Sequence, residues 1–416
     1  MEPTQRARYN ANFTEEKYAA LVRAVNETEI WPADFRISET PIFLTSEFTQ
    51  EIETAARDLI AQVQTPEFRA HAQDAIPPRL VVPNENPHPL FVQVDFGVCA
   101  GEDGRLIPRL IELQGFPSLY SYQLFFWRCL RGAFPEIPPE WQPFFSGFDQ
   151  DSYLELLRRV IVGEADPEQV ILLEIEPEKQ KTRIDFAFSK SGLGVWPVCL
   201  TSIRKRGRQL FYERDGREIR IERVYNRVIF DELLRRPELK PGFDFRDDLD
   251  IQWVGHPNWY FRISKHSLPF LKTAHTSATF FADEFPPEES LADYVLKPLY
   301  SFAGLGVDME PTREKLAALS EPHAWILQRK VTYADFVPTV DGHRSKAEIR
   351  MMFLWPEDGD PILVNNLVRM SQGRMMGVDF NKDKTWVGSS IALHQRVDAA
   401  GTGAVPFKIR NDNVLA

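Results

Sequence analysis

Helical patterns characterise the first part of the chain. Residues 15–27 (EEKYAALVRAVNE) follow Thr14, which is suited to cap a helix at that point. Residues 47–64 (EFTQEIETAARDLIAQVQ) form a second helical segment, with Ser46 or Thr45 as its cap. A cluster of prolines then predicts an irregular connection. The N-terminal region is therefore predicted to be helical.

A period-two alternation of apolar and polar residues follows. In residues 91–98 (FVQVDFGV) it places Gln93 and Asp95 on the face opposite the apolar side chains. The turn-rich sequence CAGEDGRL leads into residues 107–114 (IPRLIELQ), so we predict that the two segments form an antiparallel hairpin. A connection rich in proline and aromatic residues closes this region at about residue 150.

The second strand of this hairpin carries two polar residues within an apolar stretch. Glu112 and Gln114 are two residues apart, so they lie on one face of the strand. Asp95 projects from the partner strand and lies on the same face if the register permits. Two carboxylates and one amide form an all-oxygen cluster that suits Mg²⁺. The alternative is a solvated polar face on an amphipathic hairpin.

Helices and strands alternate through the middle of the chain. The predicted order is helix 151–163, strand 169–175, helix 179–194, strand 195–200, hairpin 209–224, strand into helix 224–236, and a strand from 250 that ends at His256 and Pro257. Asp215 and Gly216 form the two-residue turn of the hairpin. The pattern predicts an α/β domain. Its basic hairpin is interpreted as a solvated face rather than a site for an anionic partner, and His256 as a turn residue rather than a catalytic one.

Mixed helical and strand patterns resume in the last third. We predict a helix over 264–274, a strand over 294–299, a helix over 312–321 and strands over 324–331, 347–355 and 361–370. The tail after residue 397 has little periodicity, which predicts a loosely ordered segment over 398–416.

A lysine followed by glycines is the second candidate for chemistry. Lys297 ends an apolar strand, and Gly304 and Gly306 lie in the loop after it. Glycines let backbone N–H groups approach phosphate oxygens, and a nearby lysine supplies charge. The sequence differs from the Walker A pattern, so a P-loop fold is not indicated. The alternative is a lysine at a strand end before a flexible turn.

Three further sets of residues carry weaker signals. Lys265 stands at a helix start, where a lone lysine is usually exposed. The strand end at 328–331 is suited to offer backbone hydrogen bonds to a flat base. Glu348 and Arg350 share a strand face, and the following strand carries Asn365, Asn366 and Arg369. These residues suit either phosphate and metal contacts or a cross-strand ion pair.

Composition limits the classes of partner. The net charge of −11 over 416 residues argues against general affinity for nucleic acid or anionic membranes. No apolar run approaches the roughly 20 residues of a membrane span. Three cysteines, far apart and without a CxxC pair, predict a reducing, cytoplasmic setting. No GxSxG, HExxH or GxGxxG motif occurs in the sequence.

The order of these segments resembles the ATP-grasp ligases. VQVDFGV with LIPRLIELQGFPSLY resembles their Asp and Glu-x-Asn metal motif, and YVLKPLYSFAGLGV, WILQRKV and LVRMSQG follow in the expected sequence. A metal motif before the lysines is the circularly permuted arrangement, similar to the synthetase domain of glutathionylspermidine synthases and, more distantly, eukaryotic-type glutathione synthetase. Gln114 replaces the usual Asn, and Gln93 stands where those synthases place an Arg.

The resemblance implies an α/β (α+β) protein with a permuted ATP-grasp fold. The resemblance covers roughly residues 90–380, and the first 90 residues carry none. The expected divisions of the chain are a helical N-terminal region (1–89), a metal-binding hairpin that completes the ATP-grasp domain (90–150), a Rossmann-like α/β substrate domain (151–262), nucleotide-binding lobes (263–397) and the tail (398–416). These boundaries are expectations of the sequence.

The resemblance also implies the roles of individual residues. Asp95, Glu112 and Gln114 would bind Mg²⁺, and Lys265 and Lys297 the ATP phosphates. The loop 300–306, with Ser301, Gly304 and Gly306, would close over the phosphates. Gln328, Arg329, Lys330 and Val331 would line the adenine pocket. Arg369, together with Lys297, would act on the transferring phosphate or acyl phosphate.

The implied activity is an ATP- and Mg²⁺-dependent carboxylate–amine ligase acting on a small peptide or amino acid. ATP would phosphorylate a carboxylate and an amine would then attack the acyl phosphate, which requires mainly positioning and charge stabilisation. The alternatives are an ATP-grasp phosphotransferase (kinase) and a non-catalytic nucleotide-binding protein. The expected partners are a small-molecule acid and amine, without nucleic acid or membrane. A homodimer is an open alternative.

Overall fold

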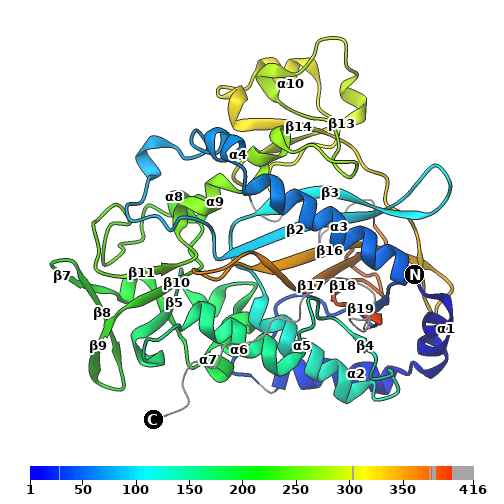
Figure 1. Cartoon of the computed structure of the whole chain (residues 1–416), viewed down its shortest axis with the longest axis horizontal. Helices are drawn as coiled ribbons and strands as arrows, with labels where there is room; N and C mark the ends of the chain where they lie inside the picture. Colours follow the sequence, from blue (N-terminus) through cyan, green and yellow to red (C-terminus); the bar gives the residue numbers. More distant parts are fainter. Residues whose placement is uncertain (28, 302–303, 374–375, 377–380, 396–416) are drawn as a thin grey trace.

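A six-stranded sheet runs through the centre of the molecule (Figure 1). The computed structural model describes residues 1–27, 29–301, 304–373, 376 and 381–395. The strands lie in the order β18 (Gly388–Ser390), β17 (Ile362–Ser371), β16 (Arg344–Leu354), β2 (Phe91–Ala100) and β3 (Leu106–Gln114), and β15 (Val337–Pro338) pairs with β16. The central sheet thus joins the early hairpin to strands from the last third of the chain.

The predicted hairpin is confirmed as the antiparallel pair β2–β3, and its register is now defined. Asp95 pairs with Glu112 and Gln93 with Gln114. An irregularity between Asp95 and Phe96 shifts the register beyond that point. On its other side β2 pairs with β16, where Arg350 lies opposite Asp95. Because residues directly opposite in a sheet point to the same face, these side chains gather on one face.

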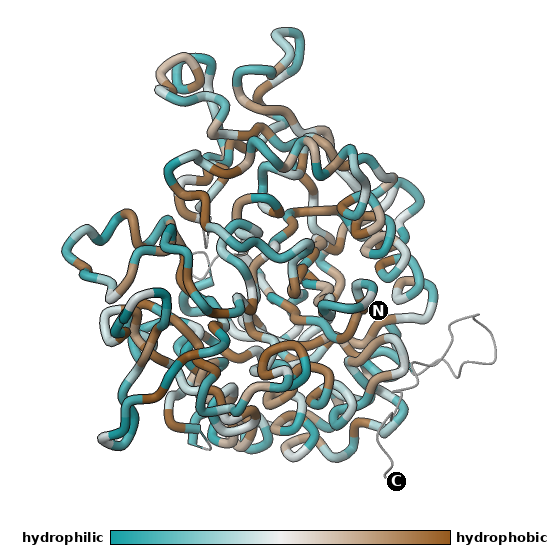
Figure 2. The backbone as a smooth tube through the Cα atoms, turned by 60° about the vertical axis from the view of Figure 1, so that its left-hand side comes forward, coloured by the Kyte–Doolittle hydropathy of each residue, from teal (hydrophilic) through white to brown (hydrophobic). Residues whose placement is uncertain are grey.

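Helix α3 (Ser46–Val63) covers the opposite face of the hairpin (Figure 1). The Thr45 side chain caps it by accepting a hydrogen bond from the Phe48 N–H, as the sequence predicts. Apolar residues of the helix, including Ile52 and Leu59, share one buried core with Val94 on β2. In Figure 2 the outlying loops are largely hydrophilic, in keeping with this interior packing.

The N-terminal region is helical, as predicted. Its helices are α1 (Pro3–Asn12), α2 (Glu15–Glu27), α3 and α4 (Pro66–His71). Helix α2 packs against α5 (Tyr120–Ala133). A small sheet of β1 (Ile42–Phe43), β19 (Ala392–Gln395) and β4 (Trp141–Gln142) joins this region to the end of the described chain.

A four-stranded parallel sheet forms the α/β part of the chain that was predicted for its middle region. Its order is β11 (Gln252–Val254), β10 (Arg223–Asn226), β5 (Val170–Glu174) and β6 (Trp196–Cys199), accompanied by α6 (Gln150–Ile161), α7 (Arg183–Leu193) and α8 (Phe230–Arg235). Gly194 ends α7 in the left-handed conformation, with a φ of 78°. The mixed α/β architecture predicted from the sequence is confirmed.

The basic hairpin projects from this sheet. It consists of β8 (Gln209–Arg214) and β9 (Arg217–Ile221), and β7 (Arg204–Arg206) pairs with β8 as a third strand. Asp215 and Gly216 have the positive φ angles of the predicted turn. Its arginines pair with carboxylates, for example Arg206 with Glu218 and Arg220 with Asp250. These pairs support the interpretation of a solvated, internally neutralised face.

A further, antiparallel sheet stands above the central one (Figure 1). It has β14 (Trp325–Arg329) between β12 (Thr279–Phe281) and β13 (Tyr294–Pro298), with α10 (Arg313–Ala317) nearby. Helix α9 (Pro257–Arg262) precedes it. The helix predicted over 264–274 is shorter, a 3₁₀ helix η5 (Lys265–Phe270), because Pro269 lacks the N–H that an α-helix would use.

Short 3₁₀ segments complete the described chain. They are η1 (Pro78–Leu80), η2 (Pro167–Gln169), η3 (Pro177–Lys179), η4 (Leu200–Ser202), η6 (Ala282–Glu284), η7 (Leu291–Asp293) and η8 (Pro322–Ala324). Among the described residues no helix is both long and apolar enough to cross a membrane. The predicted loose tail, 398–416, lies outside the described residues, and the predicted domain boundaries stay predictions.

Candidate functional site

Charged side chains from three strands lie in one row across the central sheet. Arg350 on β16 pairs with Asp95 on β2, and Asp95 pairs with Glu112 on β3. Two residues before Arg350 on the same strand, Glu348 pairs with Arg369 on β17. The register therefore places Asp95 on the same face as Glu112 and Gln114, as the prediction required. Arg369 lies on this face as well.

Asp95 is bound by two arginines. Arg350 donates from Nε to Oδ1 at 2.6 Å and from Nη2 to Oδ2 at 2.7 Å. Arg369 Nη2 donates to Oδ2 at 2.7 Å. The Asp95 side chain is only 1 % exposed. Two-point Arg–carboxylate contacts are among the strongest polar contacts in proteins, so Asp95 is firmly held.

Arg369 connects Asp95 to a second carboxylate. Its Nη2 also lies 2.7 Å from Glu348 Oε2, and the other Glu348 oxygen accepts a hydrogen bond from the Tyr333 hydroxyl. Burial and the adjacent Glu348 raise the pKa of Tyr333 well above its usual value, so the hydroxyl keeps its proton. The Arg369 side chain is 38 % exposed, which leaves part of it accessible to a ligand.

Lys297 comes from β13 and is almost completely buried. Its Nζ donates to Gln328 Oε1 at 2.6 Å, and Gln328 in turn donates from Nε2 to the Leu110 carbonyl at 3.2 Å. Burial lowers the pKa of Lys297 to about 8, despite the opposing effect of Glu112. The ammonium is therefore charged at neutral pH and close to its titration range.

Lys265 begins η5 and is mostly buried, in contrast to the exposed position usual for a lone lysine. Its Nζ donates to the Ser301 carbonyl at 2.7 Å and lies 3.8 Å from Glu112 Oε2. Lys265 and Lys297, which are 32 residues apart in the sequence, both act electrostatically on Glu112, as do Arg350 and Arg369.

Glu112 is the anion at the centre of this group. Burial would raise its pKa, but the charges of Lys265, Arg369, Arg350 and Lys297 outweigh burial and lower the pKa. The carboxylate is therefore ionised at neutral pH. One of its oxygens accepts a hydrogen bond from Gln114 Nε2.

The candidate metal-binding oxygen atoms differ in how many of their hydrogen bonds are already made. Gln114 Oε1 is buried and has no hydrogen-bond partner among the described residues, and Glu112 Oε2 has only the 3.8 Å contact to Lys265. These two atoms fit Mg²⁺, which is often bound by one or two carboxylates together with substrate phosphates. Asp95 fits less well because both of its oxygens accept from guanidinium groups. In the described part of the chain no group of three or more His, Cys, Asp and Glu side chains is arranged to hold a metal.

The segment predicted to bind a flat base differs from expectation in its backbone contacts. Strand β14 is the central strand of its sheet, and the N–H groups of Arg329 and Lys330 donate to the carbonyls of Ala278 and Asp293, both at 2.8 Å. These two N–H groups are already engaged, because the strand has neighbours on both sides. The Gln328 side chain, rather than its backbone, contacts the site, and Val331 follows the strand.

The glycine loop after Lys297 is described only in part. Gly304 and Gly306 have φ angles of 75° and 76°, which favour glycine over residues with side chains. The Ser301 carbonyl contacts Lys265, and the Ser301 hydroxyl has no hydrogen-bond partner among the described residues. The predicted closing loop 300–306 includes residues 302 and 303, which lie outside the described residues.

Several other candidates have structural roles. Asn366 donates to the carbonyls of Pro143 and Ala392, and Asn365 accepts from the Asn366 N–H, so this pair binds backbone groups. His256 caps α9 by accepting from the Asn258 N–H and contacts the Pro83 carbonyl, in agreement with its interpretation as a turn residue.

Tyr333 and Gly97 were not identified as site residues from the sequence. A Cβ atom on Gly97 would lie 2.7 Å from Tyr333 Cε1, so glycine makes room for the tyrosine ring. A glycine inside a strand is the signal that could have indicated this close approach. Tyr333 lies outside the longer strands, and no motif or hydrophobic periodicity in the sequence around it indicates a site residue.

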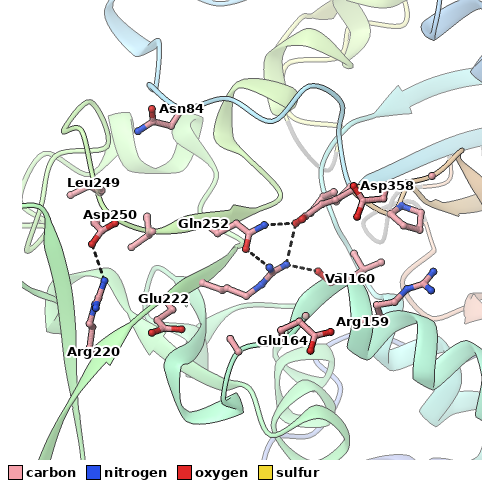
Figure 3. A pocket seen from close by; sticks show the side chains of 18 of the residues that line it. Asn84, Arg159, Val160, Glu164, Arg220, Glu222, Leu249, Asp250, Gln252 and Asp358 are labelled. Atoms are coloured by element: carbon pink, nitrogen blue, oxygen red, sulfur yellow. Dashed lines mark hydrogen bonds and ion pairs between the residues drawn. The ribbon is translucent and has the colours of Figure 1, made fainter. Parts of the chain in front are cut away.

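A cavity of about 1150 Å³ lies elsewhere in the molecule (Figure 3). It opens at the first residues of β10 and β11, beside the turn between β16 and β17. Arg223 at its wall donates to the carbonyls of Val160 and Ile161 and to the Gln252 side chain, so its charge serves the fold. None of the candidate residues above lines this cavity.

Comparison with known proteins finds similarity to solved structures but not to family models or curated sequences. No family model matches the sequence, and no curated protein matches it. Among solved structures the chain is similar to a glutathione synthetase-like effector from Globodera pallida in its apo form, with a TM-score of 0.56, 12 % identity and coverage of 95 % of this chain and 96 % of that chain. At this identity the likeness concerns the fold, and the chain has a glutathione synthetase-like fold.

Proposed function

We propose that this chain is an ATP- and Mg²⁺-dependent carboxylate–amine ligase with a circularly permuted ATP-grasp fold. The observation that carries the proposal is the position of Lys265, 3.8 Å from Glu112, together with Arg369, which binds the cross-strand partner of Glu112, Asp95. Lys297 acts electrostatically on the same carboxylate. Such a set suits a polyphosphate and a cation, because phosphoryl transfer depends on positioning and on charge neutralisation. The likeness to a glutathione synthetase-like effector supports the fold part of the proposal.

The proposed roles are those that the resemblance implies for these residues, except that Asp95 is not proposed as a metal ligand. Lys265 and Lys297 bind ATP phosphates, and the accessible part of Arg369 contacts the transferring phosphate. Residues 328–331 lie beside the adenine ring, with contacts other than the two N–H groups already engaged. Ser301, Gly304 and Gly306 approach the phosphates. Glu112 and Gln114 hold Mg²⁺, which would neutralise phosphate charge when bound.

The proposed chemistry uses no nucleophilic side chain. A substrate carboxylate oxygen attacks the γ-phosphorus of ATP, and ADP leaves. An amine then attacks the acyl carbon, phosphate leaves, and an amide forms. Arg369 and Lys297 stabilise the negative charge on the transferring group in the first step.

The test is ATP turnover with panels of small acids and amines. A ligase releases phosphate and forms an amide only when acid and amine are both present, whereas a kinase leaves a stable phosphorylated product without amine. A non-catalytic nucleotide-binding protein is the second candidate, favoured by the engagement of Asp95 with two arginines. Nucleotide binding without turnover across the panel would identify it. Failure to bind ATP would contradict both.

The proposed setting is cytoplasmic. Cys99, Cys129 and Cys199 are all unpaired thiols, which suits a reducing compartment. The proposed partners are a small acid and a small amine, and a homodimer stays a prediction that sedimentation analysis tests.

A further inference from the structure

Resting on the proposed function, we infer that the site takes one divalent cation, held by Glu112 and Gln114, and that Asp95 anchors Arg350 and Arg369 instead of binding a cation. In this arrangement the two guanidinium groups supply fixed positive charge beside Asp95, a residue that the resemblance assigns to the cation.

Asp95 has little capacity left for a metal. Arg350 occupies both of its oxygens and Arg369 adds a second donor at Oδ2, all within 2.7 Å. Two guanidinium charges at hydrogen-bond distance also repel a divalent cation. The pair is deeply buried, with Asp95 1 % and Arg350 8 % exposed, so water screens this repulsion weakly.

Glu348 is engaged in the same way. One oxygen accepts from the Tyr333 hydroxyl and the other lies 2.7 Å from Arg369 Nη2. Two of the three carboxylates on this face are thus neutralised by side chains of the protein. Only Glu112 remains as an anion without a guanidinium at hydrogen-bond distance in the described structure.

Glu112 and Gln114 provide a small oxygen site beside the arginine pair. Gln114 Oε1 is buried without a hydrogen-bond partner among the described residues, and its amide nitrogen donates to Glu112. This donation orients Gln114 and leaves its oxygen free. One carboxylate and one amide oxygen, completed by phosphate oxygens and water, suit a single Mg²⁺.

The test counts cations with Mn²⁺ as the probe. Bound Mn²⁺ is measured by electron paramagnetic resonance on the full chain, with and without one equivalent of β,γ-methylene ATP, whose binding is followed separately by calorimetry. One Mn²⁺ per chain is expected. Glu112→Gln removes a ligand and should weaken Mn²⁺ binding by about tenfold or more, whereas Asp95→Asn removes none and should weaken it by clearly less than Glu112→Gln does.

Each outcome decides the inference. Two Mn²⁺ per chain, no Mn²⁺ binding, or a site weakened as much in folded Asp95→Asn as in Glu112→Gln would overturn it. If Asp95→Asn does not fold, the count on the wild-type chain alone decides. Binding of the ATP analogue with two Mn²⁺ would remove the single-cation inference and leave the proposed function standing. Failure of the analogue to bind would remove the proposed function, and the count on Mn²⁺ alone would still decide the cation number.

Discussion

Asp95 and Arg350 face each other across the β2–β16 pair, and one guanidinium donates to both oxygens of the carboxylate. The two residues are 255 positions apart in the sequence, and their pairing joins the early hairpin to the last third of the chain. Both side chains are buried, so each charge depends on the other. The ion pair therefore supports the sheet on which the proposed site is built.

Replacement of Arg350 by leucine should destabilise the protein. The change leaves the buried Asp95 carboxylate with Arg369 alone, and we expect a loss of about 3 kcal/mol, the low end for a broken buried ion pair. Urea unfolding followed by circular dichroism measures it. The matched control is Arg344→Leu, at the exposed start of β16, with an expected change within about 0.5 kcal/mol. A loss below about 1 kcal/mol in Arg350→Leu would show that the pair is dispensable.

Tyr333 and Gly97 should act through one contact. Tyr333→Phe removes the hydroxyl that donates to Glu348, and Gly97→Ala places a Cβ atom against the ring so that the hydroxyl must move. Each change should cost about 2 kcal/mol of unfolding free energy, the range for hydrogen bonds to charged groups. Because both break the same contact, the double variant should cost much less than the sum of the two. Additive losses in a double-mutant cycle would contradict the shared contact.

The local elements of the fold follow from the sequence more closely than the pairing between distant elements. Residues 91–98 alternate with period two, and the hairpin forms as this pattern predicts. The pattern says nothing of the irregularity after Asp95 or of the neighbour β16, because both depend on tertiary packing. Pro269, in contrast, is a local signal that shortens a helix favoured by the surrounding residues.

Within the candidate site, the residue types were predictable and their partners were not. Glu112, Gln114, Lys297 and Arg369 stand out because polar residues interrupt apolar strands. That Asp95 binds arginines depends on a register set by residues far away in the sequence. The contact of Lys297 with the Gln328 side chain likewise arises only when β13 and β14 pair.

Glu174 should make stability depend on pH. Burial raises its pKa to about 8, although Arg227 opposes the shift, whereas the unfolded chain keeps the ordinary value. The stability that the buried, protonated Glu174 side chain contributes is therefore fully present below the pKa of Glu174 in the unfolded chain. It is lost as pH rises through about 8, by up to about 1.4 kcal/mol per pH unit. Glu174→Gln should remove this slope. The exposed Glu178→Gln is the control, and unchanged slopes in urea titrations of both variants would rule out the assignment.

Lys297 should make nucleotide affinity depend on pH in the same range. Burial lowers its pKa to about 8, so the ammonium that binds phosphate is lost as pH rises through that value. If the charged form alone binds, affinity for β,γ-methylene ATP should fall by about tenfold per pH unit above the pKa. Lys297→Arg, which stays charged to about pH 12, should bind with nearly constant affinity from about pH 7 to about pH 10. Calorimetric titrations across this range measure both proteins. A slope retained in Lys297→Arg would assign the titration to another group. A wild-type profile that is flat above about pH 8 would show that loss of the Lys297 charge does not control nucleotide affinity.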